Sequence, residues 1–232
     1  IQSAKKMDSL GLECVIIFGG DGTSRLVSNY LKNIPILAIS TGTNNLFPEN
    51  IDGTVAGIAV GKFVNSDNKE SFINKTKKID IFFGEQYMDS ALVDIAVTNI
   101  PYIGARAVWS MEPVSEIFIN KVKPTGIGFS SIGFRLVKNL KSEESIYIKI
   151  SKNKNNSKIK FQSPIAPGKI EEIFIDNWKL FKKSEIIKIQ TNKGTLALDG
   201  ERRLEFSDKN KANIRINNNG PTCLKIGEIL SN

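Results

Sequence analysis

The chain has 232 residues, of which 41% are hydrophobic and 24% are charged, and it carries a formal net charge of +8. This is the composition of an ordinary globular protein, and no apolar run is long enough to cross a bilayer as a helix. The sequence contains no histidine, which excludes nucleophiles activated by histidine and the common zinc sites, so a general base must be a carboxylate, a lysine or a tyrosine.

Residues 1–76 predict an α/β domain. Apolar periodicity favours helices over residues 1–12, 24–32 and 54–64, and strands over residues 15–18 and 35–39. Because nearly continuous apolar strands separated by helices are typical of parallel sheets, we expect a parallel, Rossmann-like sheet. The helical pattern of apolar residues already includes Ile1, so we expect further sequence of this domain before that residue.

Residues 77–225 predict an all-β domain. Many segments alternate apolar with polar residues between turn signals, which favours an antiparallel β-sandwich. Residues 226–232 are expected to return to the first domain. The expected strands are residues 79–83, 90–98, 146–150, 159–162, 173–175, 186–190, 195–198 and 212–216, with one short helix over residues 113–120.

The charge and the cysteine content indicate which partners and which cellular compartment to expect. The lysines are spread along the chain instead of being interleaved with aromatic residues, so we expect no nucleic-acid partner. Cys14 and Cys223 lie far apart without metal-site spacing, and we expect Cys14 to be a buried small residue. These features favour a soluble protein of the reducing cytoplasm, with no stable membrane insertion.

The most informative motif is Gly19-Gly20-Asp21-Gly22-Thr23, between an apolar strand and a segment with helical spacing. A strand, a glycine turn and a helix in succession are the usual geometry of a phosphate-binding site. Glycines let the ligand approach the backbone closely, and the first backbone amides of the helix are free to donate to it. The Asp21 carboxylate stands where an anion would bind, so it requires an intervening cation or a role as proton acceptor. An Asp-Gly hairpin turn is the alternative, but the following residues look helical.

A second turn, Thr41-Gly42-Thr43-Asn44-Asn45, follows the second predicted strand. Open α/β sheets bind ligands at the carboxyl ends of their strands. We therefore expect the two turns to face one crevice.

Three further segments are candidates. Asp199-Gly200-Glu201 lies between apolar runs and is either a hairpin turn or the source of a base, Glu201 or Asp199. Thr125-Gly126-Ile127-Gly128 favours a tight bend inside the β region over the opening of a helix. Arg106 and Trp109 could contact a nucleotide by charge and stacking, although a buried tryptophan beside an arginine is the default interpretation.

These motifs carry a family resemblance. Gly19–Thr23 matches the signature shared by NAD kinases and the diacylglycerol and sphingosine kinases, and Gly42–Asn45 resembles the second nucleotide-binding turn of that superfamily. Asp199–Glu201 is similar to an element in the β domain of its lipid-kinase members. Residues 39–48 and 197–202 most resemble the acetoin-catabolism protein X branch of the ATP-NAD kinases.

The resemblance implies an α/β domain followed by a β-sandwich, and ATP-dependent, Mg²⁺-assisted phosphorylation of a hydroxyl, with NAD as the favoured acceptor and NADP as product. It also implies a homo-oligomer, a dimer or tetramer. NAD kinases carry an early Asn-Glu pair, for which Thr98-Asn99-Ile100 is the nearest candidate and lacks the glutamate. Two alternatives to an NAD kinase therefore remain: a kinase with a lipid acceptor, and a protein that binds a nucleotide without turnover. The implied catalytic residues are Asp21 and Glu201, and the implied nucleotide-binding residues are Gly19, Gly20, Gly22, Thr23, Thr43, Asn44, Asn45, Asp199 and Gly200.

Overall fold

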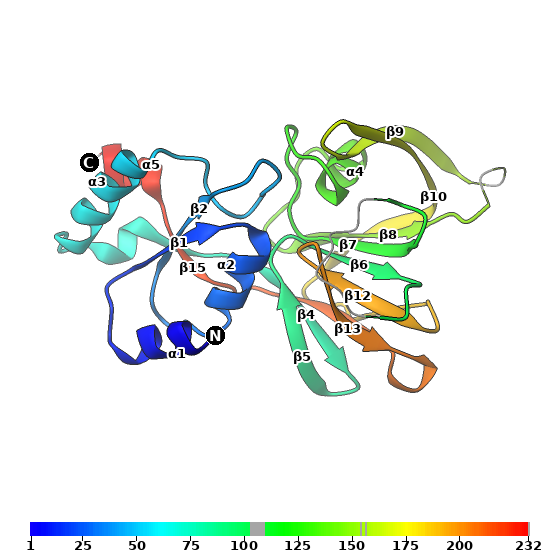
Figure 1. Ribbon diagram of the computed structural model, residues 1–232, viewed down its shortest axis with the longest axis horizontal. Coiled ribbons are helices and arrows are strands. Elements are labelled where there is room, and N and C mark those ends of the chain that lie inside the picture. Colours follow the sequence, from blue (N-terminus) through cyan, green and yellow to red (C-terminus); the bar gives the residue numbers. More distant parts are fainter. Residues whose placement is uncertain (103–109, 154, 156, 232) are drawn as a thin grey trace. The chain divides into compact units, whose positions relative to one another are not determined.

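The computed structural model describes residues 1–102, 110–153, 155 and 157–231. The chain divides into two compact units, the first formed by Ile1–Thr76 with Asn218–Asn232 and the second by Lys77–Asn217 (Figure 1). None of the helices in the described part of the chain is both long and apolar enough to cross a membrane.

The first unit is a four-stranded sheet with helices. Its strands lie in the order β1-β2-β15-β3, with β2 parallel to both β1 and β15, and β3 antiparallel to β15. Helices α3 and α5 lie side by side (Figure 1), and their Phe63 and Ile229 pack on Leu37 and Ile39 of β2. The elements are α1 (Gln2–Ser9), β1 (Val15–Gly19), α2 (Asp21–Ser28), β2 (Ile36–Ser40), α3 (Gly53–Val64), η1 (Lys69–Phe72), β3 (Ile73–Lys75), β15 (Thr222–Leu224) and α5 (Ile226–Ser231).

The predicted parallel pairing of the first two strands is confirmed, since Val15 pairs with Ile36 and Gly19 with Ser40. The expected helices at residues 1–12 and 24–32 are shorter or shifted, because α1 ends at Ser9 and α2 spans Asp21–Ser28. Strand β1 also differs from a strand buried on both faces, since Ile16 and Phe18 are exposed. As the terminal strand in the order β1-β2-β15-β3, β1 pairs with β2 alone among the strands that the structure describes.

The second unit is the predicted antiparallel sandwich. A seven-stranded sheet in the order β13-β12-β6-β7-β8-β10-β9 packs on a four-stranded sheet in the order β11-β14-β4-β5. The strands are β4 (Lys78–Phe83), β5 (Gln86–Ala91), β6 (Asp94–Thr98), β7 (Val114–Ile119), β8 (Glu144–Ile150), β9 (Ile159–Ala166), β10 (Lys169–Lys182), β11 (Ile187–Lys188), β12 (Gly194–Leu198), β13 (Glu201–Phe206) and β14 (Ala212–Asn217), with η2 at Asp208–Asn210.

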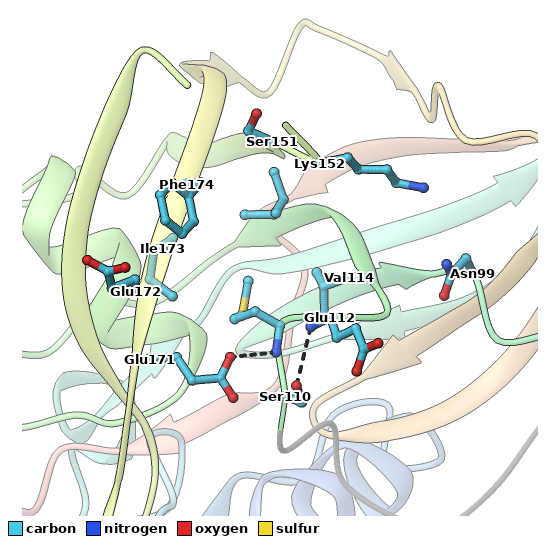
Figure 2. Close-up of a pocket in the computed structure, with 12 residues that line it drawn as sticks. Asn99, Ser110, Glu112, Val114, Ser151, Lys152, Glu171, Glu172, Ile173 and Phe174 are labelled. Atoms are coloured by element: carbon cyan, nitrogen blue, oxygen red, sulfur yellow. Dashed lines mark hydrogen bonds between the residues drawn. The ribbon is translucent and has the colours of Figure 1, made fainter. Parts of the chain in front are cut away.

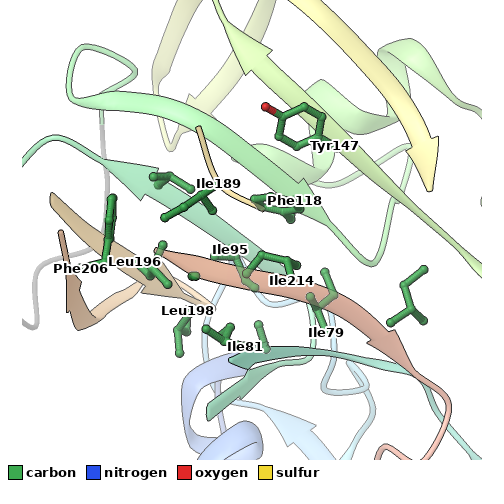
Figure 3. Close-up of a cluster of buried hydrophobic side chains, with 14 of the residues drawn as sticks. Ile79, Ile81, Ile95, Phe118, Tyr147, Ile189, Leu196, Leu198, Phe206 and Ile214 are labelled. Atoms are coloured by element: carbon green, nitrogen blue, oxygen red, sulfur yellow. The ribbon is translucent and has the colours of Figure 1, made fainter. Parts of the chain in front are cut away.

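The sandwich core lies between the two sheets. Ile79, Ile81 and Ile214 of the small sheet face Ile95, Leu196 and other residues of the large one (Figure 3). The opposite face of the large sheet carries a second apolar cluster that includes Phe129 and Ile132 of helix α4 (Phe129–Leu136). The large sheet is therefore apolar on both faces.

Three predicted elements of this unit differ from the structure. Residues 113–120 do not form a helix but contain the central strand β7, whose six β-branched, aromatic and polar residues are all buried. Residues 90–98 are not one strand, since Leu92 and Val93 form a turn between β5 and β6. The expected strand at residues 186–190 is reduced to the two residues of β11.

Candidate functional site

The motif Gly19–Thr23 forms the junction between β1 and α2. Gly20 is extended and serves as the N-cap, and the first intrahelical bond runs from the Ser24 amide to the Gly20 carbonyl oxygen, at 3.0 Å. The amides of Asp21, Gly22 and Thr23 consequently have no acceptor within the helix, and they lie at the positive end of its dipole. This is the arrangement that suits an anionic ligand.

The second turn packs directly on the first. The Thr41 amide donates to the Gly19 carbonyl oxygen at 3.4 Å, and the Asn45 side-chain amide donates to Ser40 Oγ at 2.9 Å. A Cβ atom on Gly20 would lie 2.7 Å from Asn45 Oδ1, so any larger residue there would displace the Asn45 side chain. The two turns therefore lie next to each other within this unit.

The glycines serve the protein's own packing. A Cβ atom on Gly19 would lie 2.8 Å from the Thr23 Cβ atom, and one on Gly42 would lie 3.2 Å from Asn45 Nδ2. The missing side chains thus make room for Thr23 and Asn45, whereas the sequence pattern alone suggested room for a ligand. Thr43 and Asn44 are exposed at the tip of the second turn.

Asp21 joins the two turns through its carboxylate. Oδ1 accepts the amides of Leu46 at 3.0 Å and Phe47 at 2.7 Å, and Oδ2 lies 3.2 Å from the Leu46 nitrogen. Charge-assisted bonds of this kind are among the stronger hydrogen bonds in proteins. The negative charge at the helix start is thus held by backbone amides, and it fixes the segment that follows the second turn.

Asp199 and Gly200 form the two-residue turn of the β12–β13 hairpin, in the second unit. Both have positive φ, 48° and 89°, as a type I′ turn requires. The Asp199 carboxylate accepts the amides of Leu92 at 3.0 Å, Val93 at 2.8 Å and Asp94 at 3.2 Å. The hairpin interpretation is correct, and the side chain additionally holds the turn between β5 and β6.

Glu201 is the first residue of β13 and pairs with Leu198 across the hairpin. Its carboxylate lies 4.0 Å from Arg203 NH1, and the two side chains are each 38% exposed. Partial exposure leaves such a group accessible to a substrate, whereas the Asp199 carboxylate is engaged by three amides.

The segment from Thr125 to Gly128 opens a helix, contrary to the expectation from the sequence. Gly128, with φ 74°, is the N-cap of α4, and Ser131 Oγ donates to its carbonyl oxygen at 2.7 Å. The expected tight bend is present at Gly126, whose amide donates to the Lys123 carbonyl oxygen. The spacing of Phe129, Ile132 and Leu136 is helical and could have predicted α4. Arg106 and Trp109 lie outside the described residues.

No described group of three or more cysteine, aspartate or glutamate side chains is arranged to hold a metal ion. Cys14 is half-buried rather than buried, and burial raises the pKa of its thiol to about 11. The thiol form therefore predominates at neutral pH, and Cys14 is no candidate nucleophile.

The chain matches two family descriptions. Residues 77–219 match the acetoin catabolism protein X C-terminal domain, and residues 1–67 match the ATP-NAD kinase N-terminal domain. Acetoin catabolism protein X of Cupriavidus necator is 29% identical over 222 residues, which are 93% of this chain and 62% of that protein. An NAD kinase of Thermococcus sibiricus is 35% identical over 103 residues, 44% of this chain and 35% of that protein.

Among solved structures, an NAD kinase from Archaeoglobus fulgidus in complex with ATP superposes with a TM-score of 0.55 at 16% identity, covering 98% of this chain and 82% of that one. This likeness shows a shared two-domain fold. The chain spans about three fifths of the Cupriavidus relative and about a third of the Thermococcus one. Because one description covers more than half of its length, the chain belongs to the acetoin catabolism protein X family, within the NAD kinase fold.

Proposed function

We propose that this protein is an ATP-dependent kinase that phosphorylates a hydroxyl, with the 2′-hydroxyl of NAD as the acceptor. The observation that carries the proposal is the pair of turns tied by the Asp21 carboxylate at the start of α2. A preformed set of backbone amides at a helix start is what the phosphates of a nucleotide require. The NAD kinase relatives in sequence and fold support the choice of acceptor.

In the proposed reaction, the acceptor oxygen attacks the γ-phosphorus of ATP, the bond to the β-γ bridging oxygen breaks, and ADP leaves. The amides of Gly22 and Thr23 would hold phosphate oxygens, and Thr43, Asn44 and Asn45 would bind the nucleotide from the second turn. The acceptor's proton would pass to Asp21 or Glu201, since the chain has no histidine. Asp199 and Gly200 would set the position of Glu201.

Mg²⁺ fits this arrangement as part of the nucleotide complex. The ion keeps several waters and needs only one or two carboxylates besides the phosphates of its substrate. The residue of this site that could contribute a carboxylate is Asp21, at the start of α2. Bound there, Mg²⁺ would neutralise charge on the phosphates beside Asp21.

The test is an acceptor panel with purified protein, Mg²⁺ and ATP, in which NAD, NADH and diacylglycerol are supplied separately. ADP release and phosphorylated product are both measured. The proposal expects NADP from NAD, with matching ADP. Phosphorylation of diacylglycerol alone would assign a lipid kinase, and nucleotide binding without product from any acceptor would assign a binding protein; either result rejects the proposal.

A further inference from the structure

The second unit contains a groove that the proposed reaction does not use. Two adjoining hollows of about 480 Å³ and 590 Å³ share Asn99, Ile150, Ser151 and Lys152 as lining residues. We call them together the distal groove. Strand β6 runs from Asp94, beside Asp199, to Thr98, so the groove lies about 15 Å along the sheet from the Asp199 turn.

The course of β10 creates the first hollow. The second half of β10 pairs with β8, and this pairing stops at a bulge at Asp176, where β8 ends at Ile150. The first half of β10 pairs with β9. The Ser151 amide reaches the Phe174 carbonyl oxygen at 2.8 Å, and the Met111 amide reaches Glu171 Oε2 at 3.0 Å. One backbone bond and one bond from a backbone amide to the Glu171 side chain therefore fix two walls of the hollow.

The floor of this hollow is apolar. Met111, Val114, Ile150, Ile173 and Phe174 line it, and each is less than a tenth exposed. Figure 2 shows Ile173 and Phe174 on the β10 wall, with Glu112 near the centre and Asn99 on the opposite side. A concave apolar floor of this volume suits the planar or apolar body of a small molecule.

Carboxylates surround the first hollow. Glu171 pairs with Lys169 at 2.6 Å and Glu172 pairs with Lys160 at 2.9 Å. Glu112 is exposed and, among the residues the structure describes, forms no ion pair. This end thus offers hydrogen-bond acceptors to N–H groups of a ligand.

Lysines surround the second hollow. Lys149 donates to Gln190 Oε1 at 2.7 Å, whereas Lys152 and Lys193 are exposed and take part in no ion pair within the described ranges. Glu116 also lines this hollow, but Gln190, Thr191 and Tyr147 donate to its carboxylate. Asp176 is the other carboxylate there. Two available cations mark this end as a place for an anionic group.

We propose that the distal groove binds a nucleotide whose base carries amino or ring N–H groups. The base lies on the apolar floor and donates to Glu112, and the phosphate lies between Lys152 and Lys193. A simple anion would gain nothing from the carboxylate end, and a simple amine would gain nothing from the lysines. A nucleotide satisfies both ends and the floor, so this is a second nucleotide site in addition to the one proposed for phosphoryl transfer.

Methionine provides a site-specific readout, because the chain has only three. Met111 lies in the groove, while Met7 is in α1 and Met88 is in β5. Protein labelled with ¹³C at the methionine methyl groups is titrated with AMP, and Met111→Leu assigns the Met111 signal. We expect AMP to shift that signal saturably. Ribose 5-phosphate, which lacks the base, and adenosine, which lacks the phosphate, should each bind at least about tenfold more weakly.

Matched variants test the two ends. K152Q/K193Q should weaken AMP binding at Met111 at least about tenfold, and the exposed pair K62Q/K183Q should leave it unchanged. E112Q should weaken AMP binding but not ribose 5-phosphate binding. A Met111 signal that AMP does not move, equal binding by ribose 5-phosphate, or unaltered binding in K152Q/K193Q would each overturn the proposal, whether or not the protein phosphorylates NAD.

Discussion

Asp21 and Asp199 perform the same structural task in the two units. Each carboxylate accepts backbone amides from a turn that is distant in sequence: Leu46 and Phe47 for Asp21, and Leu92 to Asp94 for Asp199. An aspartate that satisfies several amides at once fixes the shape of a turn. Both motifs are therefore parts of the scaffold, whatever chemistry they also perform.

We predict that Asp199→Ala destabilises the protein by roughly 2–4 kcal/mol, because three amides lose their acceptor and alanine is strained at φ 48°. Asp199→Asn keeps an acceptor oxygen and tolerates positive φ, so it should cost about 1 kcal/mol. Urea unfolding of both variants measures the difference. Equal stability of wild type and the alanine variant would contradict this role.

Lys77 gives a pH-dependent prediction. Burial lowers the pKa of Lys77 to about 8; the negative charge of Glu144 acts in the opposite direction, and the positive charge of Lys121 lowers the pKa further. The Lys77 Nζ atom donates hydrogen bonds to the Lys141 and Glu144 carbonyl oxygens. An unfolded lysine titrates near 10.4. Between about pH 8 and 10 the unfolded chain thus binds more protons, and the free energy of unfolding should rise with pH. Lys77→Met should reduce this rise, and exposed Lys75→Met should not; identical pH slopes would refute the assignment.

At the scale of elements, β12 depends on one glycine. Gly194, with φ 152°, begins the strand, and a Cβ atom there would lie 1.9 Å from the Thr98 carbonyl oxygen of β6. We expect Gly194→Ala to destabilise the protein by about 3 kcal/mol or more, because backbone would have to move. Gly168→Ala has positive φ but open space, so it should cost only about 1 kcal/mol. Thermal unfolding distinguishes them, and similar losses would contradict the steric argument.

Periodicity predicted the elements whose burial is local and regular. The parallel pair β1–β2, the strand β14 and most of the sandwich follow the apolar pattern. It failed at β7, which was expected as a helix over residues 113–120, because burial on both faces removes the alternation. It also failed for the turn at Leu92 and Val93, because the acceptor that fixes this turn, Asp199, lies more than a hundred residues away.

For the candidate site, the sequence predicted that the two glycine turns lie together, and the hydrogen bond from the Thr41 amide to the Gly19 carbonyl oxygen shows how. It did not predict the hydrogen bonds of Asp21, because a carboxylate at a helix start can equally bind a cation or a distant amide. The distal groove was also not predicted, since it arises where β8 ends and β10 changes partner.

At the scale of the molecule, the first unit is assembled from both ends of the chain. Strand β15 lies between β2 and β3, and Leu224 and Ile229 belong to the core of this unit. Removing residues 218–232 should therefore unfold Ile1–Thr76, while Lys77–Asn217 keeps its own core. Limited proteolysis with mass mapping measures this, and full protection of residues 1–76 in the truncated protein would contradict it.

In the proposed function, the turns joined by Asp21 carry out phosphoryl transfer. The most direct measurement is NADP formation from ATP and NAD by wild type, Asp21→Asn and Asp52→Asn. The control also changes a carboxylate that accepts a backbone amide, from Thr54 at 2.7 Å, but one at the start of α3. We predict a loss of about 100-fold or more for Asp21→Asn, with a loss of stability of only about 1 kcal/mol because asparagine keeps an acceptor oxygen, and wild-type turnover for Asp52→Asn. Wild-type turnover by Asp21→Asn would show that these turns do not carry out phosphoryl transfer.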